Sequence, residues 1–140
     1  MNIIVDTNVL LSALIKDSIT RKIIMNSNWK FYYPEISFHE IRKYKELVKK
    51  KAKLNEEEYT KLISTLLKNI RLVSKEQIIE HLEEAKKIFL EIDPDDVAFI
   101  ATSLSIKDSI IWTNDKGYEK QDKIIFIKTE KILKIFEIID

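Results

Sequence analysis

The sequence predicts an α/β fold of three layers, in which a central parallel sheet of about five strands lies between helices, in a single domain spanning residues 1–140. Strand-like and helix-like segments alternate along the chain. Strand-like segments such as Asn2–Val5 and Ser109–Trp112 are mainly apolar and do not alternate with polar residues, a pattern typical of strands buried on both faces. The chain also contains one glycine, Gly117, which argues against an all-β fold with many tight turns.

The elements follow from local pattern. Strands are expected at Asn2–Val5, Trp29–Tyr33, Ile70–Val73, Ser109–Trp112 and Lys123–Ile127. Helices are expected at Asn8–Met25 with a break near Asp17-Ser18, at Pro34–Lys53, Asn55–Lys68 and Ser74–Leu90, from Asp93-Pro94 through Leu104, and at Thr129–Ile139. Strands and helices in this order, with no linker or repeat between them, predict one parallel sheet covered on both faces.

Two of these helices carry further signals. The helix Pro34–Lys53 has proline in its first turn, and its period places five residues inward. These residues are Ile36, Ile41, Tyr44, Leu47 and Val48. In the next helix, Asn55 and Glu58 have the spacing of a capping box.

Composition excludes several classes of function. Lys and Arg (24) nearly balance Asp and Glu (23), so bulk charge predicts no nucleic-acid or membrane partner. The chain has no cysteine, which excludes disulfides and zinc–thiolate sites. No apolar stretch is long enough to span a membrane, and Asp6 interrupts the first apolar run too early for a signal peptide. We therefore expect a cytoplasmic protein.

Acidic residues fall where an open parallel sheet binds ligands, beyond the carboxyl ends of its strands. Asp6 directly follows the first strand, and Asp115 follows the strand Ser109–Trp112. The group Asp93-Pro94-Asp95-Asp96 begins the helix that leads into that strand, and Glu40 lies in the helix after the second strand. Crowded carboxylates repel one another unless a cation lies among them. With oxygen ligands alone, that cation is Mg²⁺ or Mn²⁺, which can activate water for attack on a phosphodiester.

Each acid taken singly also has a structural explanation. Asp6 suits the N-cap of a helix, and Asp93-Pro94-x-Asp96 is a favourable helix start without any metal. Asp115-Lys116-Gly117 is compatible with a simple turn, and Glu40 with a solvated glutamate. The joint placement of these acids is what favours a metal site.

Four segments in order resemble the motifs of PIN-domain nucleases, a family that includes the VapC-type toxins of toxin–antitoxin pairs. The segments are Val5-Asp6-Thr7-Asn8-Val9-Leu10, Pro34–Ile41, Asp93–Ala101 and Trp112-Thr113-Asn114-Asp115. The resemblance covers nearly the whole chain. It implies Mg²⁺- or Mn²⁺-dependent cleavage of RNA, commonly by a homodimer, and a small antitoxin protein as partner where the protein is a toxin.

The resemblance also assigns roles to residues. It implies that Asp6, Glu40, Asp96 and Asp115 hold the metal and are catalytic, and that Asn8 and Thr113 support them. Asp93 and Asp95 compete with Asp96 for the third metal-ligand position. Asp93 is also a candidate for an additional ligand. Lys116 occupies a position where some relatives have a further acid.

The segment Arg42–Lys53 has seven basic residues and one acid and directly follows Glu40. It is a candidate RNA-binding surface, with Arg42, Lys43, Lys49 and Lys50 as contacts to phosphate. A solvated helix face explains the same charges. By its spacing Tyr44 is a core residue, and His39 is a surface or packing residue.

Three alternatives remain at this point. A phosphate-receiver domain also has acids after its first strand, but the interval where its phosphorylated aspartate should fall is the lysine-rich helix. A catalytically silent PIN-like module that binds RNA or a protein is the stronger rival. A toxin and a housekeeping nuclease are not separable from the sequence.

The apolar residues of Asn55–Leu90 suit dimer or partner contacts as well as a core.

Overall fold

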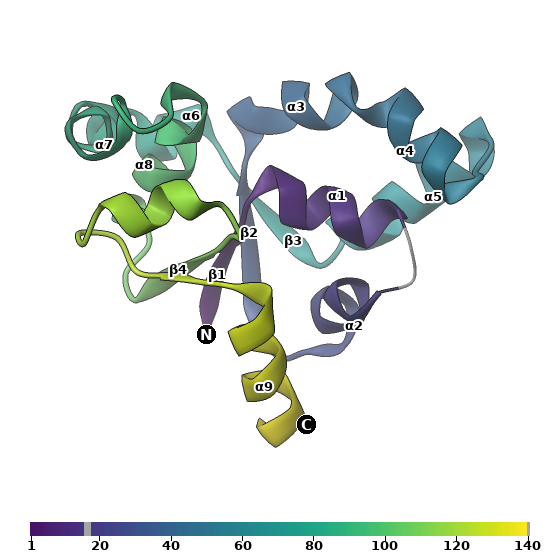
Figure 1. Ribbon diagram of the computed structural model, residues 1–140. Coiled ribbons are helices and arrows are strands. Elements are labelled where there is room, and N and C mark those ends of the chain that lie inside the picture. Colours follow the sequence, from purple (N-terminus) through teal and green to yellow (C-terminus); the bar gives the residue numbers. More distant parts are fainter. Residues whose placement is uncertain (16–17, 140) are drawn as a thin grey trace.

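A computed structural model describes residues 1–15 and 18–139. Its described residues contain one five-stranded sheet in the order β3-β2-β1-β4-β5, in which every neighbouring pair is parallel (Figure 1). The strands are β1 (Asn2–Val5), β2 (Lys30–Pro34), β3 (Ile70–Val73), β4 (Ser109–Trp112) and β5 (Phe126–Ile127). This confirms the predicted parallel sheet of about five strands.

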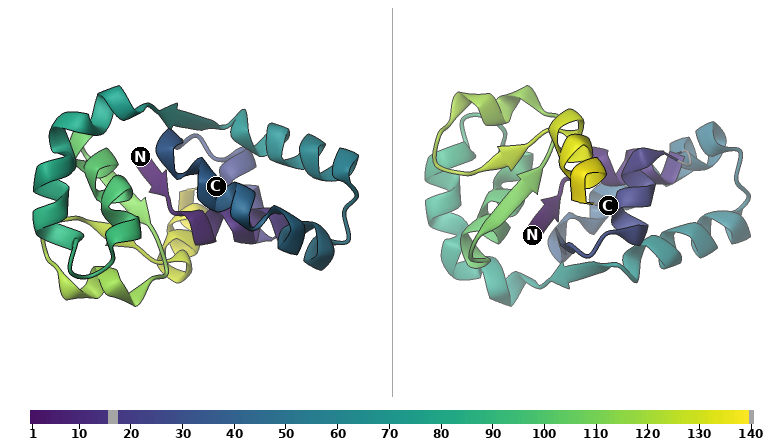
Figure 2. Two further views of the ribbon diagram at one scale, coloured as in Figure 1. Left: turned by 90° about the horizontal axis from the view of Figure 1, so that it is seen from above. Right: turned by 90° about the horizontal axis from the view of Figure 1, so that it is seen from below.

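Helices cover both faces of the sheet, which gives the predicted three layers (Figure 2). The α-helices are α1 (Thr7–Ile15), α2 (Ile19–Asn26), α3 (Phe38–Lys43), α4 (Lys45–Ala52), α5 (Glu56–Leu67), α6 (Lys75–Ile78), α7 (Leu82–Phe89), α8 (Val97–Ser105) and α9 (Thr129–Ile139). Short 3-10 helices are η1 (Glu35–Ser37), η2 (Ile79–His81), η3 (Pro94–Asp96) and η4 (Lys116–Lys120). Helix α8 packs on β1, β2 and β4 and is covered by α6 and α7, whereas α1 and α2 lie on the opposite face.

The strand order reverses beside β1. The chain runs outward from β1 to β2 and β3, then returns so that β4 pairs with the other edge of β1, with Val5 opposite Trp112. The core lies on both sides of these central strands, and its largest fully buried side chains are aromatic. They are Trp112, Tyr33, Tyr118, Phe31, Phe89 and Phe99. The crevice at the carboxyl ends of β1 and β4 is therefore the topological switch point at which sheets of this kind bind ligands.

The prediction of one continuous helix over Pro34–Lys53 is wrong in two respects: where the helix begins, and its continuity at Tyr44. Pro34 is the last residue of β2 and pairs with Val73 of β3, so it ends a strand instead of opening a helix. The helical segment then begins as η1 and breaks at Tyr44, which has φ −98° and ψ 5° between α3 and α4. The break lets both helices pack against α1. Two residues that were predicted to face inward, Ile36 and Leu47, are 39% and 46% exposed.

Two other expectations also need correction. The predicted helix Ser74–Leu90 is divided by η2, which lets its two parts, α6 and α7, both pack on α8. The predicted strand Lys123–Ile127 is reduced to Phe126–Ile127, because the side chain of Gln121 bonds the backbone of Lys123 and Ile124 in place of a strand neighbour. The predicted break near Asp17-Ser18 lies partly outside the described residues.

The capping box at Asn55 is confirmed. The side chain of Asn55 accepts the backbone N–H of Glu58 at 2.8 Å, and the Glu58 carboxylate accepts the backbone N–H of Asn55 at 2.9 Å. Within residues 1–15 and 18–139, no helix is sufficiently long and apolar to cross a membrane.

Candidate metal centre

Two acids follow the strands that flank the switch point. The backbone N–H of Asp6 donates to the carbonyl oxygen of Trp112 at 3.2 Å, which ties the end of β1 to the end of β4. The buried Asp6 carboxylate accepts the backbone N–H of Val9 at 2.8 Å, and Oδ1 of Asp115 accepts that of Gly117 at 2.9 Å. Each acid thus has the local capping or turn role that its sequence predicted. Because each carboxylate has a second oxygen, that role is compatible with holding a cation.

A cluster of three acids lies next to these strand ends. One carboxylate oxygen from each of Asp93, Asp96 and Asp115 falls within 4.8 Å of the other two. Asp93 also caps η3, since its Oδ1 accepts the backbone N–H of Asp95 at 3.0 Å. We call these residues the three-acid cluster. The structure therefore brings Asp93 as well as Asp96 next to Asp115.

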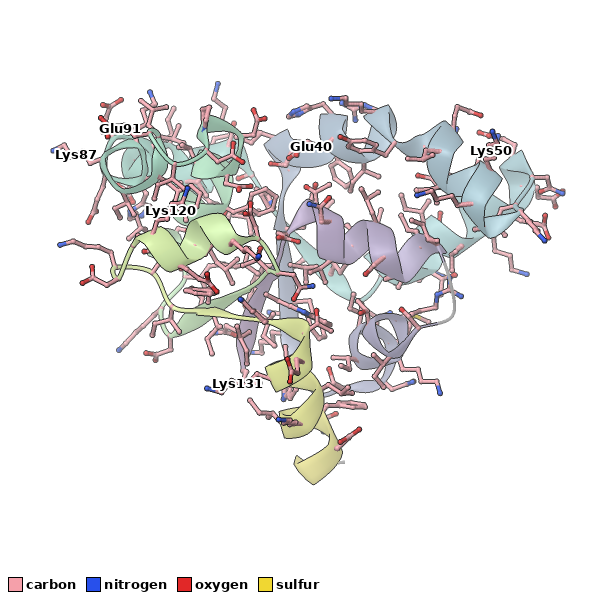
Figure 3. The ribbon with its side chains drawn as sticks, viewed as in Figure 1. Glu40, Lys50, Lys87, Glu91, Lys120 and Lys131 are labelled. Atoms are coloured by element: carbon pink, nitrogen blue, oxygen red, sulfur yellow. The ribbon has the colours of Figure 1, made fainter. Side chains whose placement is uncertain are left out.

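The three-acid cluster forms part of a larger acidic pocket of about 130 Å³. Six acids line it: Asp6, Glu40, Asp93, Asp95, Asp96 and Asp115. The side chain of Glu40 comes from α3, which carries it over the start of α1 (Figure 3). All four acids that the resemblance singled out therefore meet in one pocket, although they come from four separate parts of the chain.

Burial and mutual repulsion raise the pKa of three of these acids, Asp96, Asp6 and Glu40. Burial, above all, raises the pKa of Asp96 to about 8, and Asp93 and Asp6 raise it further. Burial also raises the pKa of Asp6 to about 6, against the opposing effect of its hydrogen bonds with Thr113 and Val9. The pKa of Glu40 is raised as well, again mainly by burial. These directions are those expected of carboxyl groups that are partly withdrawn from water and lie close together without a counter-charge.

The residues present fit a hard divalent cation. No salt bridge in the described part of the chain involves any of the six acids, and no Lys or Arg lines the acidic pocket. The available ligands are carboxylate oxygens, a donor set that suits Mg²⁺ or Mn²⁺ and does not suit zinc in a thiolate site. A cation in this position would supply the positive charge that the protein itself lacks here.

Of the two predicted supporting residues, Thr113 has contacts that fit such a role. It is fully buried, its hydroxyl accepts the backbone N–H of Asp115 at 3.1 Å, and it is hydrogen-bonded to the side chain of Asp6. Thr113 therefore links the two acids that follow β1 and β4. Asn8 lines the pocket with an exposed side chain.

The sequence interpretation missed Thr7 and Tyr33. The buried Thr7 hydroxyl donates to Oε1 of Glu40 at 3.2 Å and lies 2.8 Å from the Tyr33 hydroxyl, which donates to the carbonyl oxygen of Ser37 at 3.0 Å. This chain of hydrogen bonds connects α1 to α3 and orients Glu40. Its one sequence signal is a threonine directly after the first acid; nothing in the sequence pointed to Tyr33.

The four residues of the predicted basic surface differ in exposure, in ion pairing and in distance from the acids. Lys49 bonds Glu56 at 2.7 Å, so its charge is already partnered within the protein. Lys50 is exposed at the outer part of α4, far from Glu40 (Figure 3). Arg42 and Lys43 are exposed on α3, the helix that carries Glu40. Of the four predicted RNA contacts, these two are therefore nearest in the chain to the acids.

Tyr44 has a position that its spacing did not predict. Its ring is half-buried and packs against the core, as expected, but it also lines the acidic pocket. The Nζ atom of Lys43 lies 5.4 Å from the centre of the ring. Tyr44 thus forms an aromatic wall between the acids and the basic surface of α3.

Comparisons with known proteins identify the family of the chain and a structure with a similar fold. The family model described as "PIN domain" matches residues 4–122, and the chain therefore belongs to the PIN-domain family. A crystal structure of VapBC2 from Rickettsia felis, bound to a DNA fragment from their promoter, contains a chain with a similar fold. The TM-score is 0.66 at 15% sequence identity, over 91% of this chain and 98% of that one. A search of curated proteins found no match.

Proposed function

We propose that this protein is a divalent-metal-dependent ribonuclease that hydrolyses phosphodiester bonds of RNA. The observation that carries the proposal is the meeting of six acids, with no basic residue among them, at the switch point of the sheet. Membership of the PIN-domain family, whose members are nucleases, supports hydrolysis as the reaction class.

The chain's own residues would position the reaction rather than take part in covalent chemistry. Asp96 and Asp115, together with Asp93, would hold Mg²⁺ or Mn²⁺, and Asp6 and Glu40 would complete the ligand set. When bound, such an ion activates water for attack on phosphorus and neutralises charge on the phosphate oxygens. Hydrogen bonds from Thr113 and Thr7 would fix the carboxylates in position.

Substrate and partners follow from the surroundings of the pocket. Arg42 and Lys43 would bind phosphates of the RNA next to the acids, and Lys50 would extend the basic surface along α4, whereas Lys49 is engaged by Glu56. The resemblance to VapC-type toxins and the fold shared with a VapBC2 chain support a role as the toxin of a toxin–antitoxin pair. In that role the protein would form a homodimer and bind a small antitoxin.

The test is cleavage of end-labelled mixed RNA in Mn²⁺, Mg²⁺ or chelator. The parent protein is compared with an Asp6→Asn, Asp96→Asn double variant and with Asp122→Asn, which removes an exposed carboxylate outside the acidic pocket. We expect metal-dependent cleavage by the parent and by Asp122→Asn, and none by the double variant. Equal cleavage by all three proteins would show a contaminating nuclease or a wrong site. RNA binding that persists in chelator, with no cleavage in any metal, would favour the silent binding module.

A further inference from the structure

A second hollow adjoins the acidic pocket. It has a volume of about 250 Å³, and Asp95 lines both this hollow and the acidic pocket, so the two are neighbours at that residue. Residues of η1 and α3 form one wall, and α7, η3 and the start of α8 form the other. We call it the side hollow. A nucleotide next to one held in the acidic pocket is therefore within reach of the side hollow on the Asp95 side.

The walls of the side hollow are mainly apolar. Ile36 contributes from η1, and Leu82, Pro94, Val97 and Ala98 face it from the other side. Ile36 is 39% exposed although the helical period predicted it to be buried. No Lys or Arg lines the side hollow, and its one carboxylate, Asp95, repels a phosphate. A flat, uncharged ring, by contrast, can stack between apolar walls.

The polar groups of the side hollow include two that accept hydrogen bonds. Nδ1 of His39 lies 2.9 Å from the carbonyl oxygen of Ile36. A carbonyl only accepts, so Nδ1 carries the hydrogen, and in this tautomer Nε2 is an acceptor. The exposed carboxylate of Asp95 is a second acceptor; it lies outside the three-acid cluster and outside every salt bridge of the described residues. The hydroxyl of Ser37 can donate or accept.

We infer that the side hollow binds the nucleobase of a nucleotide next to the scissile phosphate. This inference rests on the proposed ribonuclease function and adds a base subsite to it. The apolar walls take the faces of the ring, and His39 and Asp95 accept hydrogen bonds from its edge. A base with an exocyclic amino group, namely adenine, cytosine or guanine, is therefore preferred over uracil.

The experiment uses short RNA oligonucleotides with one mapped cleavage site. Each nucleotide flanking the site is replaced in turn by A, C, G, U or an abasic residue, and kcat/KM is measured in Mn²⁺. The variants are Ala98→Leu, which fills the hollow, and His39→Phe, which keeps apolar surface but removes Nε2. Ile125→Ser is the matched control, because this 68%-exposed isoleucine lies outside both the acidic pocket and the side hollow. Circular dichroism and Mn²⁺ affinity verify that each variant is folded with its metal site intact.

At one flanking position we expect the abasic oligonucleotide to be cleaved about tenfold or more slowly by the parent and by Ile125→Ser. Ala98→Leu should cleave the complete and abasic oligonucleotides at similar, reduced rates. His39→Phe should still cleave the complete RNA faster than the abasic RNA. It should, however, reduce the ratio of kcat/KM for adenine, cytosine or guanine to kcat/KM for uracil at that position. Equal cleavage of complete and abasic RNA by the parent would overturn the inference and leave the hollow to another occupant, such as a polypeptide partner.

Fluorescence anisotropy of the same oligonucleotides separates the inference from the proposed function. If no RNA is cleaved, but the flanking base strengthens binding to the parent and Ala98→Leu removes that effect, the nuclease proposal fails and the base subsite stands. If neither cleavage nor binding depends on the base, the side hollow takes no base.

Discussion

Asp96 shows how a residue of this site opposes the stability of the fold. Its carboxyl is half-buried among other acids, and no basic side chain of the described residues pairs with it. Burial without a counter-charge disfavours the ionised form, so the pKa rises to about 8. A residue chosen for stability alone at this position would carry no charge.

Asp96→Asn should therefore stabilise the metal-free protein while it abolishes function. In chelator at pH 7 to 8 we expect an increase of about 1–3 kcal/mol in the free energy of unfolding, because the buried carboxylate is gone. In Mn²⁺ the same variant should cleave RNA at least about 100-fold more slowly than the parent. Urea unfolding and a cleavage assay measure the two effects, with Asp122→Asn as the exposed control. A metal-free variant less stable than the parent would contradict the prediction.

Thr113 joins two of the acids and should respond to loss of its hydroxyl. Thr113→Val leaves the backbone N–H of Asp115 without its acceptor and removes a hydrogen bond to Asp6. We expect a loss of about 1–3 kcal/mol in stability and of about 10–100-fold in Mn²⁺ affinity or cleavage rate. Thr113→Ser keeps the hydroxyl and should restore most of both. If Val and Ser variants bind Mn²⁺ equally well, the hydroxyl does not position the acids.

At the scale of elements, the basic residues of α3 and α4 form two groups, one in salt bridges within the protein and one exposed to solvent. Lys45 and Lys49 both bond Glu56 at the start of α5, so their charges fasten α4 to α5. Arg42 and Lys43 on α3 are exposed and form no salt bridge in the described part of the chain. The same helical segment thus supplies both a structural contact and a candidate phosphate-binding surface.

The double variant Arg42→Gln, Lys43→Gln should weaken RNA binding more than Lys49→Gln does. Each phosphate contact that is lost should reduce the slope of log affinity against log salt by about 0.7 for single-stranded RNA. Lys49 already bonds Glu56, so its replacement should alter that slope little and mainly lower stability. Anisotropy titrations across a range of salt concentrations give the slopes. A larger slope change for Lys49→Gln would reverse the assignment.

The elements could be predicted where local pattern determines them. The apolar runs of β1 and β4 and the capping box at Asn55 are local signals, and each appears where it was expected. The breaks at Tyr44 and Ile79–His81 were missed, because they depend on how successive helices pack on α1 and α8. Periodicity does not contain that information, since it describes one helix at a time.

The candidate site could be predicted only in outline. That Asp6 and Asp115 lie at the carboxyl edge of the sheet follows from an apolar strand before each of them, whereas the pairing of those two strands is seen only in the structure. The contact of Asp93 as well as Asp96 with Asp115 depends on the 3-10 turn η3, which the sequence did not distinguish from an α-helix. The bond from Thr7 to Glu40 joins residues 33 positions apart and needs the three-dimensional fold.

For the whole molecule, the topology gathers acids at one edge of the sheet, and this makes metal-free stability depend on pH. The folded pKa values of Asp6 (about 6) and Asp96 (about 8) lie above the ordinary value of 3.8. Between pH 4 and 8 the folded state therefore binds more protons than the unfolded state, so the free energy of unfolding falls as pH rises. The contribution of these two acids is fully present below pH 3.8 and is lost through pH 6 and then pH 8. The pKa of Glu56 is lowered to about 2 by its bonds with Lys45 and Lys49, so its contribution has the opposite sign: it is present above pH 4.5 and is lost as the pH falls toward 2.

In chelator we therefore expect the melting temperature to decline from about pH 5 to pH 8, and Asp96→Asn to flatten the upper part of that decline. Added Mn²⁺ should reverse it, because the ion binds carboxylates that have lost their protons and stabilises the folded state by mass action. The increase in melting temperature on adding Mn²⁺ should consequently be larger at pH 8 than at pH 5.5. Thermal unfolding in buffers of matched ionic strength, with and without Mn²⁺, measures both effects. A stabilisation by Mn²⁺ that does not depend on pH, or that persists in Asp96→Asn, would place the ion outside the acidic pocket.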